Sequence, residues 1–230
     1  MTLQEAIMLR HSVRRYIHKP LSTEIVETLR KKIEECNAEG RLHIQLVTNE
    51  TRAFTGLFSY GKFSGVENYI VMVGRKADDL DERVGYYGEQ LVLLAQTLGL
   101  NTCWAGLSYR KVNEAYIVGD DEKLTCMIAL GYGATQGHKR KSKTAELVSN
   151  VGSDSPEWFR NGVEAALLAP TAINQQKFSF TLLPNEQDKG AKPKVLANRG
   201  FSMVGYTKMD IGIARLHFEI GAGKENFDWA

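Results

Sequence analysis

A short apolar run followed at once by a long amphipathic segment constrains the fold more than any other feature of the sequence. The run covers residues 69–74 and is rich in β-branched side chains, which is typical of a strand buried on both faces. Residues 79–98 then repeat apolar side chains every three or four positions before Gly99, which predicts a helix with one buried stripe. A buried strand joined to such a helix predicts a sheet covered by helices.

The first part of the chain shows the same alternation. A T-x-x-E box starting at Thr2 and a capping Ser22 each precede an amphipathic segment, which predicts helices that end near Arg10 and at Gly40. Further strands are expected at three apolar or alternating runs, residues 43–47, 102–104 and 126–131. This order of elements indicates an α/β arrangement.

A polar stretch at residues 149–154 marks an expected boundary. Beyond it, Ser155 and Pro156 predict the start of a helix, a strand is expected over residues 178–183, and a last helix over residues 210–223. Helix, strand and long helix therefore occur twice, which indicates an internal repeat.

These patterns indicate an internally duplicated chain of alternating helices and strands. The predicted halves are residues 1–150 and 151–230. At 230 residues, with 43% hydrophobic side chains, the chain can bury a core without disulfides or a structural metal.

Charge and cysteine content limit the classes of partner. The formal net charge is only +2, so no general attraction to nucleic acid or to an anionic membrane is expected. The three cysteines form no CxxC pair, and no metal site is expected. No apolar run approaches about 18 residues, and the first nine residues do not resemble a signal peptide. We therefore expect a soluble, cytoplasmic protein.

Residues 10–14 place cationic and hydroxyl side chains at alternate positions. In extended backbone, side chains two apart share a face, so Arg10, Ser12 and Arg14 would present two guanidinium groups and a hydroxyl to the same side. Such a set matches a phosphate monoester and a neighbouring polar ring. A solvated basic turn has the same pattern, and the residues alone leave both interpretations open.

Two further polar segments are candidates for binding. Residues 169–176 form a loop whose side-chain amides donate and accept, which suits the edge of a flavin pyrimidine ring, although an ordinary polar loop has the same composition. Residues 138–143 form a basic run, which fits a phosphate site, a solvated surface or a nucleic-acid-binding module. The small net charge and the lack of a flanking aromatic ladder disfavour the last of these.

Four motifs together resemble the FMN-dependent nitroreductase family. Residues 10–16 are similar to its N-terminal R-x-S-x-R-x-[FY] signature, and residues 85–104 are similar to its central helix. The L-G-Y-G of residues 130–133 resembles a late family strand, and the basic run that ends in residues 143–148 resembles a C-terminal phosphate-binding segment. The resemblance covers residues 1–148 in order, and it implies an α+β fold of three-layer α/β/α type.

One departure from the family pattern carries information about organisation. Members of the usual type carry P-S-x-x-N-x-Q-P after the second helix, where this chain has residues 36–40, and in their homodimers this loop reaches the flavin from the opposite subunit. Here a similar motif stands at residues 170–176, with Lys177 in the place of the final proline. The late motif, with the segment 210–219, resembles the single-chain, internally duplicated subfamily. This implies a monomer that acts as a pseudo-dimer, with further association left open.

The resemblance implies FMN-binding residues in both halves. The first half would supply the phosphate, ribityl and ring contacts, from Arg10, His11, Ser12, Arg14, Ala105, Gly106, Leu107, Lys141 and Lys143. In this set Arg14 would face the N1/O2 edge, His11 the ribityl chain, and the backbone of residues 105–107 the N5 atom. The second half would supply Pro170, Thr171, Ala172, Asn174 and Gln176. Candidates for the wall of the substrate pocket are Tyr60, Lys62 and Phe63.

The implied activity is hydride transfer from NADH or NADPH, through FMN, to a small electron-poor acceptor such as a nitro compound or a quinone, with ping-pong kinetics. The flavin would carry the chemistry, so no protein catalytic residue is expected beyond assistance from Arg14. One alternative is an FMN-binding storage or sensor protein without turnover, because no G-x-G-x-x-G nicotinamide fingerprint occurs. A second is a basic nucleic-acid module on residues 138–143.

Overall fold

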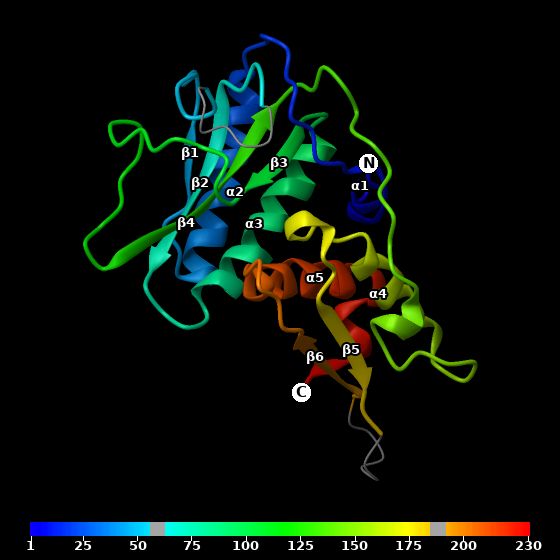
Figure 1. Ribbon diagram of the computed structural model, residues 1–230. Helices are drawn as coiled ribbons and strands as arrows, with labels where there is room; N and C mark the ends of the chain where they lie inside the picture. The colour runs from blue at the N-terminus through cyan, green and yellow to red at the C-terminus, as the bar shows by residue number, and fades with distance from the viewer. Residues whose placement is uncertain (56–62, 185–191) are drawn as a thin grey trace. The chain divides into compact units, whose positions relative to one another are not determined.

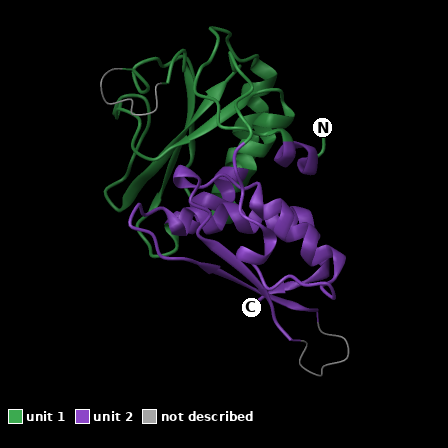
Figure 2. Ribbon diagram, turned by 45° about the vertical axis from the view of Figure 1, so that its right-hand side comes forward, with its two compact units in different colours: residues 1–2, 9–80, 90–139 green, residues 3–8, 81–89, 140–230 purple. Residues whose placement is uncertain are grey.

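The computed structural model describes residues 1–55, 63–184 and 192–230, which divide into two compact units (Figures 1 and 2). Unit 1 contains residues 1–2, 9–80 and 90–139, and unit 2 contains residues 3–8, 81–89 and 140–230. The units follow packing, whereas the predicted halves describe a suspected duplication. The division at residue 150 therefore stays a proposal.

Unit 1 is built on a four-stranded antiparallel sheet in the order β1-β2-β4-β3. Its strands are β1 (Gln45–Val47), β2 (Asn68–Arg75), β3 (Asn101–Ala105) and β4 (Glu122–Gly131). All four predicted strands are confirmed, and β4 begins four residues earlier than its apolar run. Its first residues are polar and were not recognisable as strand from hydrophobicity alone.

Both faces of this sheet are covered, as the apolar run of β2 predicts. Tyr69, Val71 and Val73 point into a cluster with loop residues on one face, and Ile70 and Met72 on the other face are also fully buried. The helix α2 (Thr23–Gly40) contacts β1 and lies behind the sheet in Figure 1. Its predicted cap is confirmed, because the Ser22 hydroxyl accepts a hydrogen bond from the Ile25 N–H at 3.3 Å.

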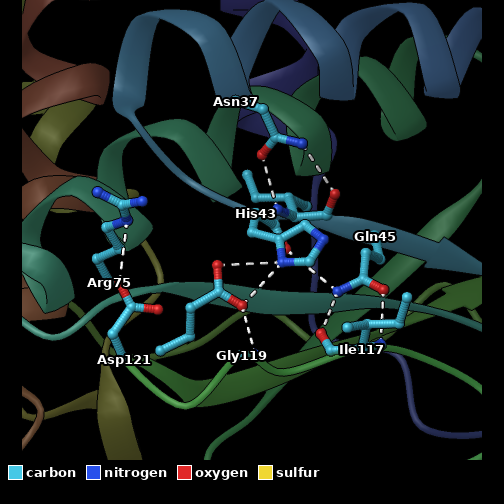
Figure 3. A network of polar contacts seen from close by, with 9 residues as sticks. Asn37, His43, Gln45, Arg75, Ile117, Gly119 and Asp121 are labelled. Atoms are coloured by element: carbon cyan, nitrogen blue, oxygen red, sulfur yellow. Dashed lines mark hydrogen bonds and ion pairs between the residues drawn. The ribbon is translucent and has the colours of Figure 1, made fainter.

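A polar network holds the end of α2 against the sheet (Figure 3). The Asn37 amide donates to the Ile44 carbonyl at 3.0 Å and accepts from the Ile44 N–H at 2.7 Å. His43, next in the chain, pairs with Glu122 of β4 at 2.9 Å. These contacts fix the α2–β1 connection to β4 at one end of the sheet.

Unit 2 combines helices with a small second sheet. The helices are α1 (Leu3–Leu9, of which residues 3–8 belong to this unit), α4 (Glu157–Leu167) and α5 (Thr207–Ala222), and the strands are β5 (Phe178–Leu182), β6 (Lys194–Arg199) and β7 (Asp228–Trp229). β5 pairs with β6 antiparallel, and β6 pairs with β7 in parallel. The core of this unit is aromatic, with Phe218 contacting Phe159, Phe180, Phe227 and Trp229.

The helix α3 (Leu80–Thr97) contributes residues 81–89 to unit 2, where it crosses α5 at two glycines. A Cβ atom on Gly85 would lie 2.1 Å from the Met209 carbonyl oxygen, and one on Gly212 would lie 2.1 Å from the Glu82 carbonyl oxygen. Only hydrogen fits at either position. The two helix backbones therefore touch, which explains the glycines in both segments.

The late segment 210–219 stabilises this helix crossing through buried polar contacts. His217 and Glu89 are fully buried and joined at 2.9 Å, and the second ring nitrogen of His217 lies 3.1 Å from the Ala165 carbonyl oxygen. The Glu219 carboxylate accepts from the Tyr86 hydroxyl at 2.6 Å and from the Trp229 indole at 2.7 Å. These residues tie α5 to α3, α4 and β7.

The order helix, strand, strand, helix, strand occurs in residues 23–105 and again in residues 157–229. This fits the predicted internal duplication, and the mixed α+β class is confirmed. The strands β6 and β7 were not expected from the sequence, and α5 begins three residues earlier than predicted. Among the described residues, no helix is both long and apolar enough to cross a membrane.

Candidate functional site

The cationic segment, residues 10–16 of unit 1, runs beside β3. The Val13 N–H donates to the Thr102 carbonyl at 3.0 Å, and Ser12 forms a parallel bridge with Thr102. Tyr16 is buried, and its hydroxyl donates to the Val13 carbonyl at 2.6 Å. The aromatic position of the N-terminal motif therefore anchors the segment in the core of unit 1.

The side chains of Arg10, Ser12 and Arg14 all act on Cys103 of β3, whereas Val13 is buried in the core. Burial raises the pKa of the Cys103 thiol, and the charges of Arg14 and Arg10 and a hydrogen bond with Ser12 oppose this rise. This is compatible with a common side for the three side chains, and their role in binding an anion stays a prediction. Cys103 was not expected to take part, because nothing in its sequence neighbourhood distinguishes it.

The basic run returns to the cationic segment within unit 1. Gly137 has φ +77°, and a Cβ atom on it would lie 2.5 Å from the Cβ atom of His11. The buried Asn101 fixes this path, since its side chain accepts from the Gly133 N–H at 3.0 Å and donates to Gln136 at 3.3 Å. Gly137 thus lets residues 133–139 pass directly over His11.

The remaining unit 1 candidates follow β3. Ala105 is its last residue and is buried, Gly106 is half-buried, and the Leu107 side chain is 78% exposed. Phe63 packs on the ring of Phe54 at 4.9 Å between centroids, at the margin of the core. Tyr60 and Lys62 lie outside the described residues.

The amide loop, residues 170–176 of unit 2, is shaped by hydrogen bonds of its own residues. Gln176 is buried, and its side chain accepts from the Lys143 N–H at 2.9 Å and donates to the Leu167 carbonyl at 3.2 Å. Its N–H donates to the Thr171 hydroxyl at 3.1 Å. The Gln176 side chain therefore fixes the loop from inside, in addition to any role toward a ligand. Pro170 at the start of the loop is also buried.

The two lysine candidates differ in their surroundings. The Lys143 ammonium donates to the Gln176 carbonyl at 2.5 Å, and burial and the nearby Lys177 lower its pKa. Lys141 is exposed, and its carbonyl accepts from the Asn174 amide at 2.8 Å. Lys141 is thus the better placed of the two to meet a solvent-accessible anion.

The amide loop has an unusual backbone. Ile173, Asn174 and Gln176 have φ values of 47°, 58° and 46°, in the left-handed region that non-glycine residues rarely adopt. The Ile173 side chain is 78% exposed, so it gains little from burial. Strain of this kind persists where the surroundings impose it, and it clusters at ligand-binding sites. This backbone is compatible with a binding role for the loop, which stays a prediction.

The sequence did not reveal that Arg140, within the basic run, supports the start of the amide loop. Its guanidinium group donates to the Leu167 carbonyl at 2.8 Å and to the Ala169 carbonyl at 2.6 Å, where α4 ends and the amide loop begins. A cation at this place satisfies the terminal carbonyl groups of the helix. Part of the predicted basic run therefore supports the loop from within unit 2.

A family model described as "Putative TM nitroreductase" matches residues 2–222, nearly the whole chain. The chain belongs to this family. This confirms the family that the sequence motifs resemble. No curated protein sequence matches the chain.

Solved structures with this fold confirm the predicted fold class. A "putative nitroreductase" from Thermotoga maritima is 23% identical, with a TM-score of 0.63, and the match covers 98% of this chain and 85% of that chain. A "putative nitroreductase" from Desulfovibrio desulfuricans, in complex with FMN, is 18% identical, with a TM-score of 0.51, and the match covers 68% of this chain and 98% of that one. A "putative NADH dehydrogenase/NAD(P)H nitroreductase" from Bacteroides thetaiotaomicron is 17% identical, with a TM-score of 0.51, over 64% of this chain and 95% of that one. About two thirds of this chain therefore matches nearly all of two relatives.

Proposed function

We propose that this member of the nitroreductase family binds one FMN and transfers hydride from NADH or NADPH to a small electron-poor acceptor. The observation that carries the proposal is the position of Ser12 beside Thr102 of β3, where the charges of Arg10 and Arg14 also act on Cys103. When bound, FMN would supply the hydride chemistry, so the protein has only to bind it, orient it and tune its electronics.

The donor set of unit 1 fits the charged end of FMN. The Arg10 guanidinium group offers paired N–H donors to phosphate oxygens, and the Ser12 hydroxyl adds a further donor. Arg10 is 7% exposed, so its charge is screened less by solvent than that of a surface arginine. Gly137 brings the following backbone over His11, which would enclose the ribityl side.

Arg14 is the exposed cation of the set, and we propose that it lies at the N1/O2 edge of the flavin. Negative charge develops there on reduction, and a fixed cation stabilises it. The backbone of residues 105–107, which continues from β3, would approach the N5 atom. In unit 2, Thr171, Ala172 and Asn174 would meet the pyrimidine edge, with Gln176 holding their loop in shape.

The relatives support the cofactor and the reductant. The Desulfovibrio desulfuricans protein was crystallised with FMN, and the Bacteroides thetaiotaomicron protein is described as an NAD(P)H nitroreductase. The Thermotoga maritima match over 98% of this chain supports a single chain that does the work of a homodimer. We propose that each chain binds one FMN.

Anaerobic mixing of the purified, FMN-loaded protein with NADH or NADPH tests the proposal. Bleaching of the flavin absorption band, followed by its return on addition of a nitroaromatic compound or a quinone, is the expected result. A bound flavin that neither reductant bleaches would instead support a storage or sensor protein. An absence of flavin binding would refute the proposed function.

A further inference from the structure

One buried carboxylate accepts hydrogen bonds from two residues of the amide loop. Asp210, in the first turn of α5, is 3% exposed. Its Oδ1 atom accepts from the Ala172 N–H at 3.0 Å, and its Oδ2 atom accepts from the Gln175 Nε2 atom at 2.6 Å. Both oxygens of one carboxylate are therefore bonded to two residues of the same loop.

The two hydrogen bonds to Asp210 flank residues of the loop that have positive φ angles. Ile173 and Asn174, which have positive φ, lie between the two residues that Asp210 holds. The Gln175 amide also donates to the Gly205 carbonyl at 3.0 Å, which links the loop to the segment before α5. Fixing both ends of a short segment is a way to keep it in a conformation that it would otherwise leave.

Burying the ionised Asp210 carboxylate at this position is energetically unfavourable. Burial raises the pKa of Asp210 to about 6, although the Ala172 N–H, the Gln175 amide and the charge of Arg140 oppose the rise. A neutral amide would fill the same space without the cost of burying a charge. Retaining a costly polar group at a binding element is typical of a site that trades stability for function.

We propose that Asp210 is a positioning residue of the FMN site, which keeps Asn174 in its left-handed conformation by holding Ala172 and Gln175. The inference rests on the proposed function, since it concerns the loop that would meet the flavin ring. Asp210 acts through the loop and does not itself contact the cofactor.

Three variants test the proposal. Asp210→Asn preserves the volume and one acceptor, but it places an N–H donor opposite the Gln175 donor. Gln175→Ala removes the gripped side chain and leaves Asp210 unchanged. Asp228→Asn, at an exposed position of β7 in the same unit, is the matched control for loss of one negative charge.

Each variant is measured at pH 8 in three ways: FMN affinity of the flavin-free protein, amide hydrogen exchange of residues 170–178, and unfolding temperature. Asp210→Asn and Gln175→Ala are expected to weaken FMN binding about tenfold and to speed exchange in the loop about tenfold, because a hydrogen bond to a charged group is lost. The unfolding temperature of Asp210→Asn is expected to stay the same or rise, because a buried charge is removed. Asp228→Asn should match the wild type in all three.

Parallel loss of FMN affinity and unfolding temperature in Asp210→Asn would overturn the inference, because it would show a purely structural role. Faster loop exchange with unchanged FMN affinity would also overturn it. If the wild type and Asp210→Asn bind FMN equally well, the inference fails while the proposed function stands. If even the wild type binds no FMN, the proposed function fails and the inference fails with it.

Discussion

Replacing Gly212 with alanine should destabilise the protein although alanine is the better helix former. The added Cβ atom would lie 2.1 Å from the Glu82 carbonyl oxygen, against about 3.3 Å for an ordinary carbon–oxygen contact. The α3 and α5 backbones would have to separate by about 1 Å, and overpacking of this kind costs roughly 1–3 kcal/mol. Because the clash is with backbone rather than with a flexible side chain, we expect the upper end of this range.

The higher helix propensity of alanine recovers about 1 kcal/mol, so the net loss is about 2 kcal/mol. For a chain of this size that lowers the unfolding temperature by roughly 4–8 °C. Gly152→Ala is the control, because a Cβ atom there meets nothing within 4 Å and its φ lies outside the left-handed region. Calorimetry or circular dichroism measures both variants. Equal unfolding temperatures for the two variants would refute the close helix crossing.

Three further results are expected. Arg14→Gln should lower the midpoint potential of the bound flavin by about 30 mV in a redox titration, which is equivalent to about 1.4 kcal/mol for two electrons. The control Arg75→Gln, a surface change in the same unit, should have no effect. Gln176→Leu should reduce the free energy of unfolding in urea by roughly 1–3 kcal/mol, because it leaves the Lys143 N–H without its acceptor and removes one of the donors to the Leu167 carbonyl. The exposed Lys177→Gln should change it little. Burial raises the pKa of Asp210 to about 6, so the native state binds the carboxyl proton more tightly than the unfolded chain does. The protonated carboxyl therefore contributes to the free energy of unfolding fully below about pH 4, and this contribution is lost as the pH rises through about 6. A plot of stability against pH should therefore be flatter between pH 4 and 7 for Asp210→Asn than for the wild type, and identical slopes would contradict this assignment.

The sequence predicted the elements whose period is strong. The run of β2 and the stripe of α3 are long and apolar, and Ser22 stands where a helix cap is needed, so local rules sufficed. The strands β6 and β7 were missed because β6 mixes polar with apolar residues and β7 has only two residues. Their pairing depends on chain segments distant in sequence, which periodicity does not report.

The candidate site was predictable to the extent that its residues are neighbours in sequence. The spacing of Arg10, Ser12 and Arg14 predicts a common side because alternation in extended backbone is local, and the effect of all three on Cys103 is compatible with it. Arg140 was predicted only as part of a charged run, since the Leu167 carbonyl that it binds stands 27 residues later. The grip of Asp210 on Gln175 spans 35 residues, and an acid within the apolar start of α5 was the one signal that could have found it.

Calorimetric titration of the flavin-free protein with FMN tests the central claim most directly. The wild type should bind one FMN per chain. Arg14→Gln and Asn174→Asp should each lower the affinity for FMN about tenfold. Aspartate at position 174 tolerates the left-handed backbone but lacks the amide group of asparagine. Two FMN per chain, or an affinity that either variant leaves unchanged, would contradict this claim.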